Sequence, residues 1–120
     1  MQYDISYYVD EKNRVVVATA NFEDEIERLF EKKVGVPIRE FYGDLYYNIN
    51  KKCFCRFTRV IARCHPDDTF DIEVGKKICR QKLKDKFYKQ LNWCVSEFIK
   101  HYSVLIQNGH NFLGDVEAHK

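Results

Sequence analysis

A helical pattern from about residue 71 to residue 108 is the strongest constraint on how this 120-residue chain can fold. Apolar side chains recur along one face of this segment, as they do in an amphipathic helix. The positions that define the face are Phe87, Leu91, Cys94, Phe98 and Leu105. Because an apolar face must be covered, the rest of the chain has to supply a layer that packs against it. A span of this length also allows a kink or break near Asn92.

The residues before this segment predict strands and one shorter helix. Residues 3–9 and 14–20 are rich in Tyr, Ile and Val, and the polar turn between them predicts a β-hairpin. Residues 21–35 change to helical spacing, with a charged opposite face. Residues 45–49 and 53–63 predict a second hairpin with a long return strand.

The predicted order is β-β-α-β-β-α, which indicates an α+β fold. We expect an antiparallel sheet of about four strands, covered by a short helix and a long C-terminal helix. Residues 1–108 are predicted to form a single domain, and the glycine-punctuated residues 109–120 a C-terminal tail. No apolar run approaches the ~20 residues that cross a bilayer, and the N-terminus lacks a signal-peptide pattern. We therefore expect no membrane contact, a cytosolic location and reduced cysteines.

Charge is distributed unevenly along the chain. Residues 51–89 contain 12 Lys/Arg and 5 Asp/Glu, a net charge of +7, whereas residues 1–50 carry −4. A segment of this kind attracts phosphate or an acidic protein surface. Lys76, Arg80 and Lys84 are spaced by four residues and form one row on the predicted helix.

Further cations widen this basic surface. Lys77, Lys82, Lys86 and Lys89 lie on the solvent side of the same predicted helix. The preceding strand contributes Arg56, Arg59 and Arg63, interleaved with Phe54 and Phe57. Lysine and arginine neutralise phosphates and aromatic rings stack on bases, so the surface is a candidate for nucleic-acid binding. The alternative is a solvated helix face.

The shorter predicted helix offers an acidic surface. Its acidic residues are Glu23, Asp24, Glu25, Glu27 and Glu31. Such a row can imitate nucleic-acid phosphates and occupy a basic channel of a partner. The alternative is a solvated cluster, which the positive end of the helix dipole favours at a helix start.

Two cysteines suggest a structural zinc site. Cys53 and Cys55 are two residues apart on a predicted strand, so both thiols face the same side and could share one ion. His65 is a third candidate ligand, and a fourth could come from the C-terminal histidines, His101, His110 or His119. The spacing matches no standard zinc finger, so the alternative is that the cysteines fill the core as small apolar residues.

No catalytic pattern accompanies these features. The sequence lacks GxSxG, Walker, HExxH and Rossmann glycine motifs. Cys64 and His65 are adjacent, so in a strand their side chains would point to opposite faces. Asp67 and Asp68 follow Pro66 just before a helix, which is typical of turns. We therefore predict that the protein is not an enzyme.

The stretch ARCHPDDTFD at residues 62–71, followed by Gly75, Ile78 and Arg80, resembles a pattern in small proteins encoded by phages and prophages of Gram-positive bacteria. In that pattern a strand ends, a Pro-x-Asp-x-Phe-Asp step follows, and a basic helix begins. The step has the chemistry of a structural joint, because Asp71 or Thr69 can cap the helix. The glycine would then permit close packing of the helix on the sheet.

The resemblance implies an accessory phage function. Many proteins of this size and origin bind a host defence component, and the best-known class is the type II anti-CRISPR proteins, which inhibit Cas9. On that basis we expect a non-enzymatic inhibitor in the host bacterial cytoplasm that binds Cas9 and blocks loading of guide RNA or target DNA. The alternatives are a nucleic-acid-binding phage protein that uses the basic surface within residues 56–89, and a small zinc-stabilised interaction domain.

Overall fold

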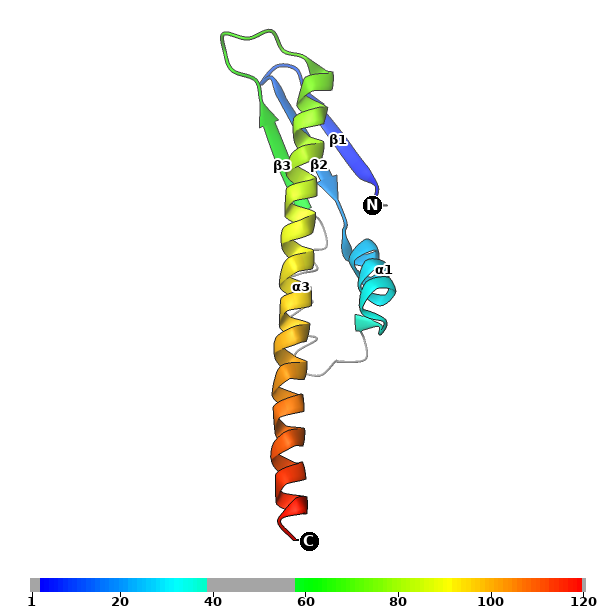
Figure 1. Ribbon diagram of the computed structural model, residues 1–120. Coiled ribbons are helices and arrows are strands. Elements are labelled where there is room, and N and C mark those ends of the chain that lie inside the picture. The colour runs from blue at the N-terminus through cyan, green and yellow to red at the C-terminus, as the bar shows by residue number, and fades with distance from the viewer. Residues whose placement is uncertain (1–2, 39–57, 120) are drawn as a thin grey trace.

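A long helix lies along a three-stranded antiparallel sheet in the computed structural model, which describes residues 3–38 and 58–119 (Figure 1). The elements are β1 (Ile5–Asp10), β2 (Val15–Ala20), α1 (Glu23–Val34), β3 (Thr58–Arg63) and α3 (Ile72–Glu117). The molecule is elongated, with extents of 79 × 23 × 22 Å, because α3 continues far beyond the sheet (Figure 1).

The prediction of a four-stranded sheet in β-β-α-β-β-α order is wrong. Within the described ranges the sheet has three strands in the order β1-β2-β3, and the chain runs β-β-α-β-α. β3 pairs directly with β2, with Val60 opposite Ala18 and Ala62 opposite Val16. These four side chains are buried, so the buried face of β3 continues that of β2 without an intervening strand. The expected strand at 45–49 lies outside the described residues.

The first hairpin is confirmed, and its turn is built from polar side chains. The Asp10 carboxylate accepts hydrogen bonds from the Asn13 backbone N–H at 3.0 Å and from its side-chain amide at 2.7 Å. These bonds favour the ionised carboxylate, and the side-chain bond from Asn13 is the main reason that the pKa of Asp10 is lowered. Arg14 adopts a left-handed φ of 57° and leads the chain into β2.

The core lies between β2 and α3. Val16 and Ala18 are fully buried on the face of β2 that α3 covers, and Cys79, Leu83 and Phe87 are fully buried on α3 at four-residue spacing. The Cys79 thiol donates to the Val16 carbonyl oxygen at 3.4 Å. Burial raises the pKa of the Cys79 thiol. Cys79 is therefore a core residue, in line with the expected alternative that cysteines fill the core as small apolar residues.

α1 closes the core at the end of the sheet. Phe22, Ile26 and Phe30 are buried at helical spacing, as the sequence predicts. The ring of Phe22 meets Phe87 edge to face at a centroid distance of 5.3 Å, and Phe30 meets Phe98 in the same way at 5.1 Å. Edge-to-face contacts of this kind add to the burial of the rings themselves. α1 is therefore attached to two successive levels of α3.

Local hydrogen bonds hold both ends of α1. The side chain of Asn21 accepts the Glu23 N–H at 3.0 Å, although the helix itself begins after Phe22. Gly35 has a left-handed φ of 97° and donates its N–H to the Glu31 carbonyl oxygen. A left-handed residue at this position is the usual helix stop, and glycine adopts it without steric cost.

The start of α3 confirms the predicted joint. The Asp71 carboxylate accepts the N–H groups of Glu73 and Val74 at 3.0 and 3.3 Å, which is an N-cap. Gly75 then lies against β2 so closely that an added Cβ atom would be 2.5 Å from Cγ2 of Val16. The glycine is therefore required for close packing of the helix on the sheet.

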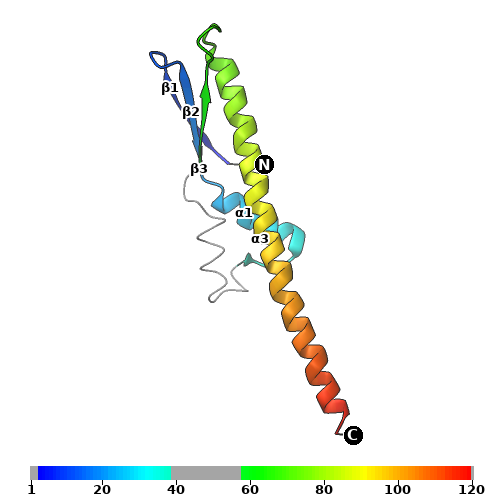
Figure 2. The same ribbon diagram turned by 90° about the vertical axis from the view of Figure 1, so that its left-hand side faces the viewer.

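The far end of α3 differs from the prediction. The helix has no break at Asn92 and continues through Gly109 and Gly114 to Glu117, so the expected helix end at residue 108 is wrong. Residues 103–119 are exposed and project as a single rod (Figure 2). The domain boundary at residue 108 stays a prediction. No helix in the described ranges is both long and apolar enough to cross a membrane.

Candidate nucleic-acid interface

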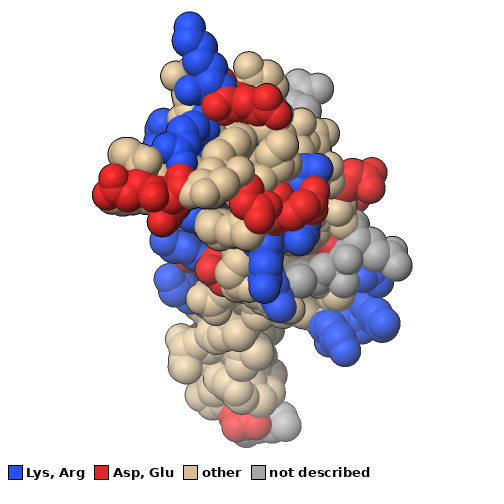
Figure 3. Space-filling model, turned by 90° about the horizontal axis from the view of Figure 1, so that it is seen from above, with Lys and Arg blue, Asp and Glu red and all other residues tan. Residues whose placement is uncertain are grey.

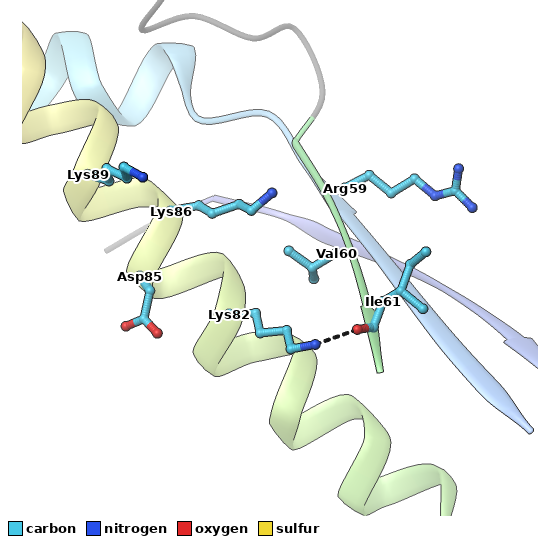
Figure 4. A pocket seen from close by; sticks show the side chains of 7 residues that line it. All are labelled: Arg59, Val60, Ile61, Lys82, Asp85, Lys86 and Lys89. Carbon is cyan, nitrogen blue, oxygen red and sulfur yellow. Dashed lines mark hydrogen bonds between the residues drawn. The ribbon is translucent and has the colours of Figure 1, made fainter. Parts of the chain in front are cut away.

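An open groove of about 530 Å³ lies between β3 and α3 (Figure 4). Its lining residues are Arg59, Val60, Ile61, Lys82, Asp85, Lys86 and Lys89. Among the described residues β3 is an edge strand of the sheet, with β2 on one side. The other side of its backbone faces this groove. Figure 4 shows the side chains of Lys82 and Lys86 extending from α3 toward β3, whereas Asp85 points away. We call this feature the β3–α3 groove.

Two hydrogen bonds attach α3 to the edge strand. The Lys82 ammonium donates to the Ile61 carbonyl oxygen at 2.6 Å, and the Gln90 side chain donates to Oγ1 of Thr58 at 3.1 Å. An edge strand carries unpaired backbone groups, and a lysine contact of this kind protects them from pairing with another chain. The two bonds are eight residues apart on α3, so they fix the separation of helix and strand along the groove.

The groove is strongly basic. Three of its lining side chains are lysines and one is a carboxylate, Asp85, which accepts a hydrogen bond from Gln81 at 3.0 Å. Among residues 3–38 and 58–119, none of Lys82, Lys86 and Lys89 forms an ion pair with a carboxylate. Uncompensated cations along a concave surface create a positive potential that attracts polyanions.

The basic row that the sequence singles out lies on the other flank of α3, beside β1. The Lys76 ammonium is 5.2 Å from the ring centroid of Tyr7, and Arg80 donates to the Tyr7 hydroxyl at 3.4 Å. Lys77 and Lys84 are exposed next to Arg80. Sequence spacing groups all these cations into one surface, but the structure divides them between two flanks. The lysines of the β3–α3 groove are the ones that share a hollow with the strand.

The outer face of the sheet adds two arginines and an aromatic ring. Arg59 and Arg63 are exposed, and Figure 4 shows Arg59 pointing away from α3. The strand register aligns Tyr8 with Val17 and Ile61, so Tyr8 lies in the row between those of the two arginines. Tyr8 is 65% exposed. Arg56, the other predicted strand cation, lies outside the described residues.

The acidic row on α1 is shorter than expected. Glu25 is buried and forms an ion pair with Arg28. Asp24 and Glu31 are exposed, and the remaining two predicted residues, Glu23 and Glu27, are partly exposed. The helix therefore presents a mixed surface, because Arg28 and two lysines of its last turn lie beside these acids.

The predicted zinc ligands are not brought together by the described part of the chain. Cys53 and Cys55 lie outside it. His65 is an exposed turn residue whose Nδ1 accepts the Asp67 N–H at 3.2 Å. No group of three or more His, Cys, Asp or Glu side chains within 3–38 and 58–119 is arranged to hold a metal ion. The zinc site stays a prediction.

Cys64 organises the turn between β3 and α3. Its sulfur lies 3.5 Å from the His65 carbonyl oxygen and 3.7 Å from those of Asp68 and Thr69. Arg14 donates to the same sulfur at 3.4 Å. The thiol therefore faces backbone carbonyls of the turn, and this arrangement gives Cys64 a structural role.

Comparisons of the chain with protein-family models, with curated proteins and with solved structures gave no match. The protein is therefore described by its own structure, which is a small α+β fold with a basic groove at the edge of the sheet. The resemblance to phage and prophage proteins stays a prediction.

Proposed function

We propose that this protein is a non-enzymatic nucleic-acid-binding protein and that the β3–α3 groove is its contact surface. The observation that carries the proposal is the convergence of Lys82, Lys86 and Lys89 beside the edge of β3 with a single carboxylate nearby. Ammonium groups neutralise phosphates and release the counterions condensed on them, which is the main source of affinity in sequence-independent binding.

The spacing of the three lysines suits a phosphate backbone. Lys82 and Lys86 are separated by a rise of about 6 Å along the helix axis, and Lys86 and Lys89 by about 4.5 Å. One strand of a duplex carries a phosphate about every 3.4 Å along its axis. The row from Lys82 to Lys89 therefore spans about 10 Å along the helix, or about three phosphate intervals.

The outer face of the sheet supports contact with bases as well. Tyr8 presents a largely exposed ring, and Arg59 and Arg63 lie on either side of its row. Bases stack on aromatic rings and on guanidinium planes in proteins that bind single strands. A strand that crosses the edge of β3 would meet both the lysines of the groove and the ring of Tyr8.

Binding should depend steeply on salt. With four phosphates contacted by the three groove lysines and Arg59, the logarithm of the affinity for duplex DNA should fall with log salt at a slope of about −3 to −4. That slope corresponds to a loss of roughly 100-fold between 50 and 200 mM salt. Fluorescence anisotropy with labelled single-stranded and duplex oligonucleotides measures it. If neither oligonucleotide binds at 50 mM salt, the proposal is wrong and an acidic protein becomes the better partner for the groove.

A second candidate is the inhibitor of a bacterial defence effector, with Cas9 as the expected target. Its support is the phage-like stretch at residues 62–71 together with two surfaces of opposite character, the basic groove and the exposed Asp24 and Glu31 of α1. In this role the protein acts in the cytoplasm of the bacterial host and blocks loading of guide RNA or target DNA.

The inhibitor candidate predicts that a stoichiometric amount of the protein stops DNA cleavage by Cas9. Because a nucleic-acid-binding protein can also hide the substrate, the cleavage assay needs an excess of unrelated duplex DNA. Competitor DNA should relieve masking of the substrate but leave direct inhibition of Cas9 intact. Normal cleavage together with no complex in a pull-down would exclude Cas9 as the target.

A further inference from the structure

The C-terminal end of α3 carries large apolar side chains that nothing in the described chain covers. Figure 3 shows this end at the bottom of the view as a tan protrusion, with the red of Asp and Glu only at its tip. Residues 101–114 contain no Lys, Arg, Asp or Glu. The face begins at Tyr102, which is half-buried and packs against Phe98. The exposed apolar residues that follow on this face are Leu105, Ile106, Phe112, Leu113 and Val116. We call these six residues the C-terminal stripe.

The C-terminal stripe continues the face by which α3 packs on its own core. Phe87, Cys94 and Phe98 lie on that face and contact the core. From Phe98 the apolar positions continue at Tyr102, at Leu105 and Ile106, at Phe112 and Leu113, and at Val116, and Gly109 stands at the central position of the repeat. A heptad repeat of this kind indicates packing against another helix. The exposure is high for such a face, at 60% for Ile106 and 69% for Phe112.

The stripe is symmetrical about Gly109. Ile106 and Phe112 are three residues from the glycine, Leu105 and Leu113 are four, and Tyr102 and Val116 are seven. A second copy of α3 that runs in the opposite direction and crosses at Gly109 would therefore meet an apolar side chain at every level. At the crossing point, the lack of a side chain on either glycine permits close approach of the two helices. Because the repeat is its own complement in this direction, a second copy of the chain supplies the matching surface, and residues 101–114 contain no charge that would oppose this contact.

The fold also sets the direction of the pairing. The stripe and the body of the protein lie on the same face of α3, so two copies paired in parallel and in register would place both bodies in the same space. Antiparallel pairing places each body beyond the C-terminal end of the other helix. The overlap from Tyr102 to Val116 is about 22 Å long.

We infer that this protein forms an antiparallel homodimer through the C-terminal stripe. The contact joins the same surface of both copies, as two-fold symmetry requires. The paired stripes cover on the order of 1,000 Å², near the lower end of specific interfaces, which corresponds to a dimer that dissociates on dilution.

Sedimentation velocity of the full chain from 1 to 200 µM tests the dimer, and the expected result is a concentration-dependent shift from monomer to dimer. Ile106→Lys should raise the dissociation constant at least tenfold without loss of helix content, because the side chain is exposed in the monomer. Val104→Lys is the matched control, since Val104 is also 60% exposed but lies on the opposite side of the helix. A wild-type protein that stays monomeric, or equal effects of both substitutions, would overturn the inference.

The direction of pairing has a separate test. In the antiparallel arrangement that crosses at Gly109, Ile106 lies within one residue rise of the level of Leu113 of the second copy. Ile106→Glu and Leu113→Lys should therefore each weaken self-association. An equimolar mixture of the two variants should recover the dimer, because the new glutamate then meets the new lysine. In a parallel pair these two positions are about 10 Å apart along the axis. A mixture that remains monomeric, when each variant alone is also monomeric, would exclude antiparallel pairing.

Discussion

A triple variant is expected to lower the affinity for nucleic acid at least 100-fold at 50 mM salt when it combines Lys82→Glu, Lys86→Glu and Lys89→Glu. The three lysines carry the charge of the β3–α3 groove, and their reversal replaces phosphate contacts with repulsion at the edge of β3. The slope of log affinity against log salt should also become shallower by about three, because each lysine lost releases roughly one counterion fewer. Anisotropy titrations at several salt concentrations measure both quantities.

The other flank of α3 supplies the matched control. Lys77→Glu, Arg80→Glu and Lys84→Glu change the net charge by the same amount, on the same helix, but away from β3. This second variant should lose less affinity and keep the wild-type salt slope, because it alters only the long-range field. Since Lys82 also donates to the Ile61 carbonyl oxygen, the double variant Lys86→Glu/Lys89→Glu should show the same direction of effect with that contact intact. Equal losses from both flanks would contradict the assignment of binding to the groove.

The elements with strong local signals were predictable from the sequence. The hairpin of β1 and β2, the buried face of α1 and the Asp71 cap each depend on residues close together in the chain. The C-terminal end of α3 could not be predicted in the same way. Gly109 and Gly114 suggested a tail because each glycine costs a helix about 1 kcal/mol relative to alanine. The apolar spacing that continues to Val116 is the signal that could have extended the helix.

The candidate site was predictable in composition but not in arrangement. The charge excess of residues 51–89 is visible in the sequence, whereas its division between two flanks depends on which strand lies beside which side of α3. The sequence spacing puts Lys76, Arg80 and Lys84 in one row on the helix, and Lys82 only widens that row. Only the contact of Lys82 with β3 shows that this lysine and its neighbours share a groove. Long-range pairing of this kind leaves no local trace in the sequence.

Gly75→Ala is expected to destabilise the fold, although the same change in an exposed helix would stabilise it. Alanine at an open helical position gains up to about 1 kcal/mol over glycine. At Gly75 the new methyl group would lie 2.5 Å from Cγ2 of Val16 and 3.1 Å from its Cβ. Val16 is fully buried on the central strand, between Val9 and Ala62, and its branched side chain has little rotamer freedom. Overpacking of this kind costs about 1–3 kcal/mol, so we expect a net loss of about 1–2 kcal/mol.

Urea unfolding followed by circular dichroism measures the change in the free energy of unfolding. Gly114→Ala is the control, because an added Cβ there meets nothing within 4 Å, and this variant should be at least as stable as the wild type. Val16→Ala alone loses core packing, but in the Gly75→Ala background it also removes the clash. The two substitutions should therefore be coupled by at least about 1 kcal/mol, with the double variant more stable than the sum of the single effects. If Gly75→Ala proves as stable as Gly114→Ala, the close approach of α3 to β2 is wrong, and with it the position of the helix from which the groove lysines extend.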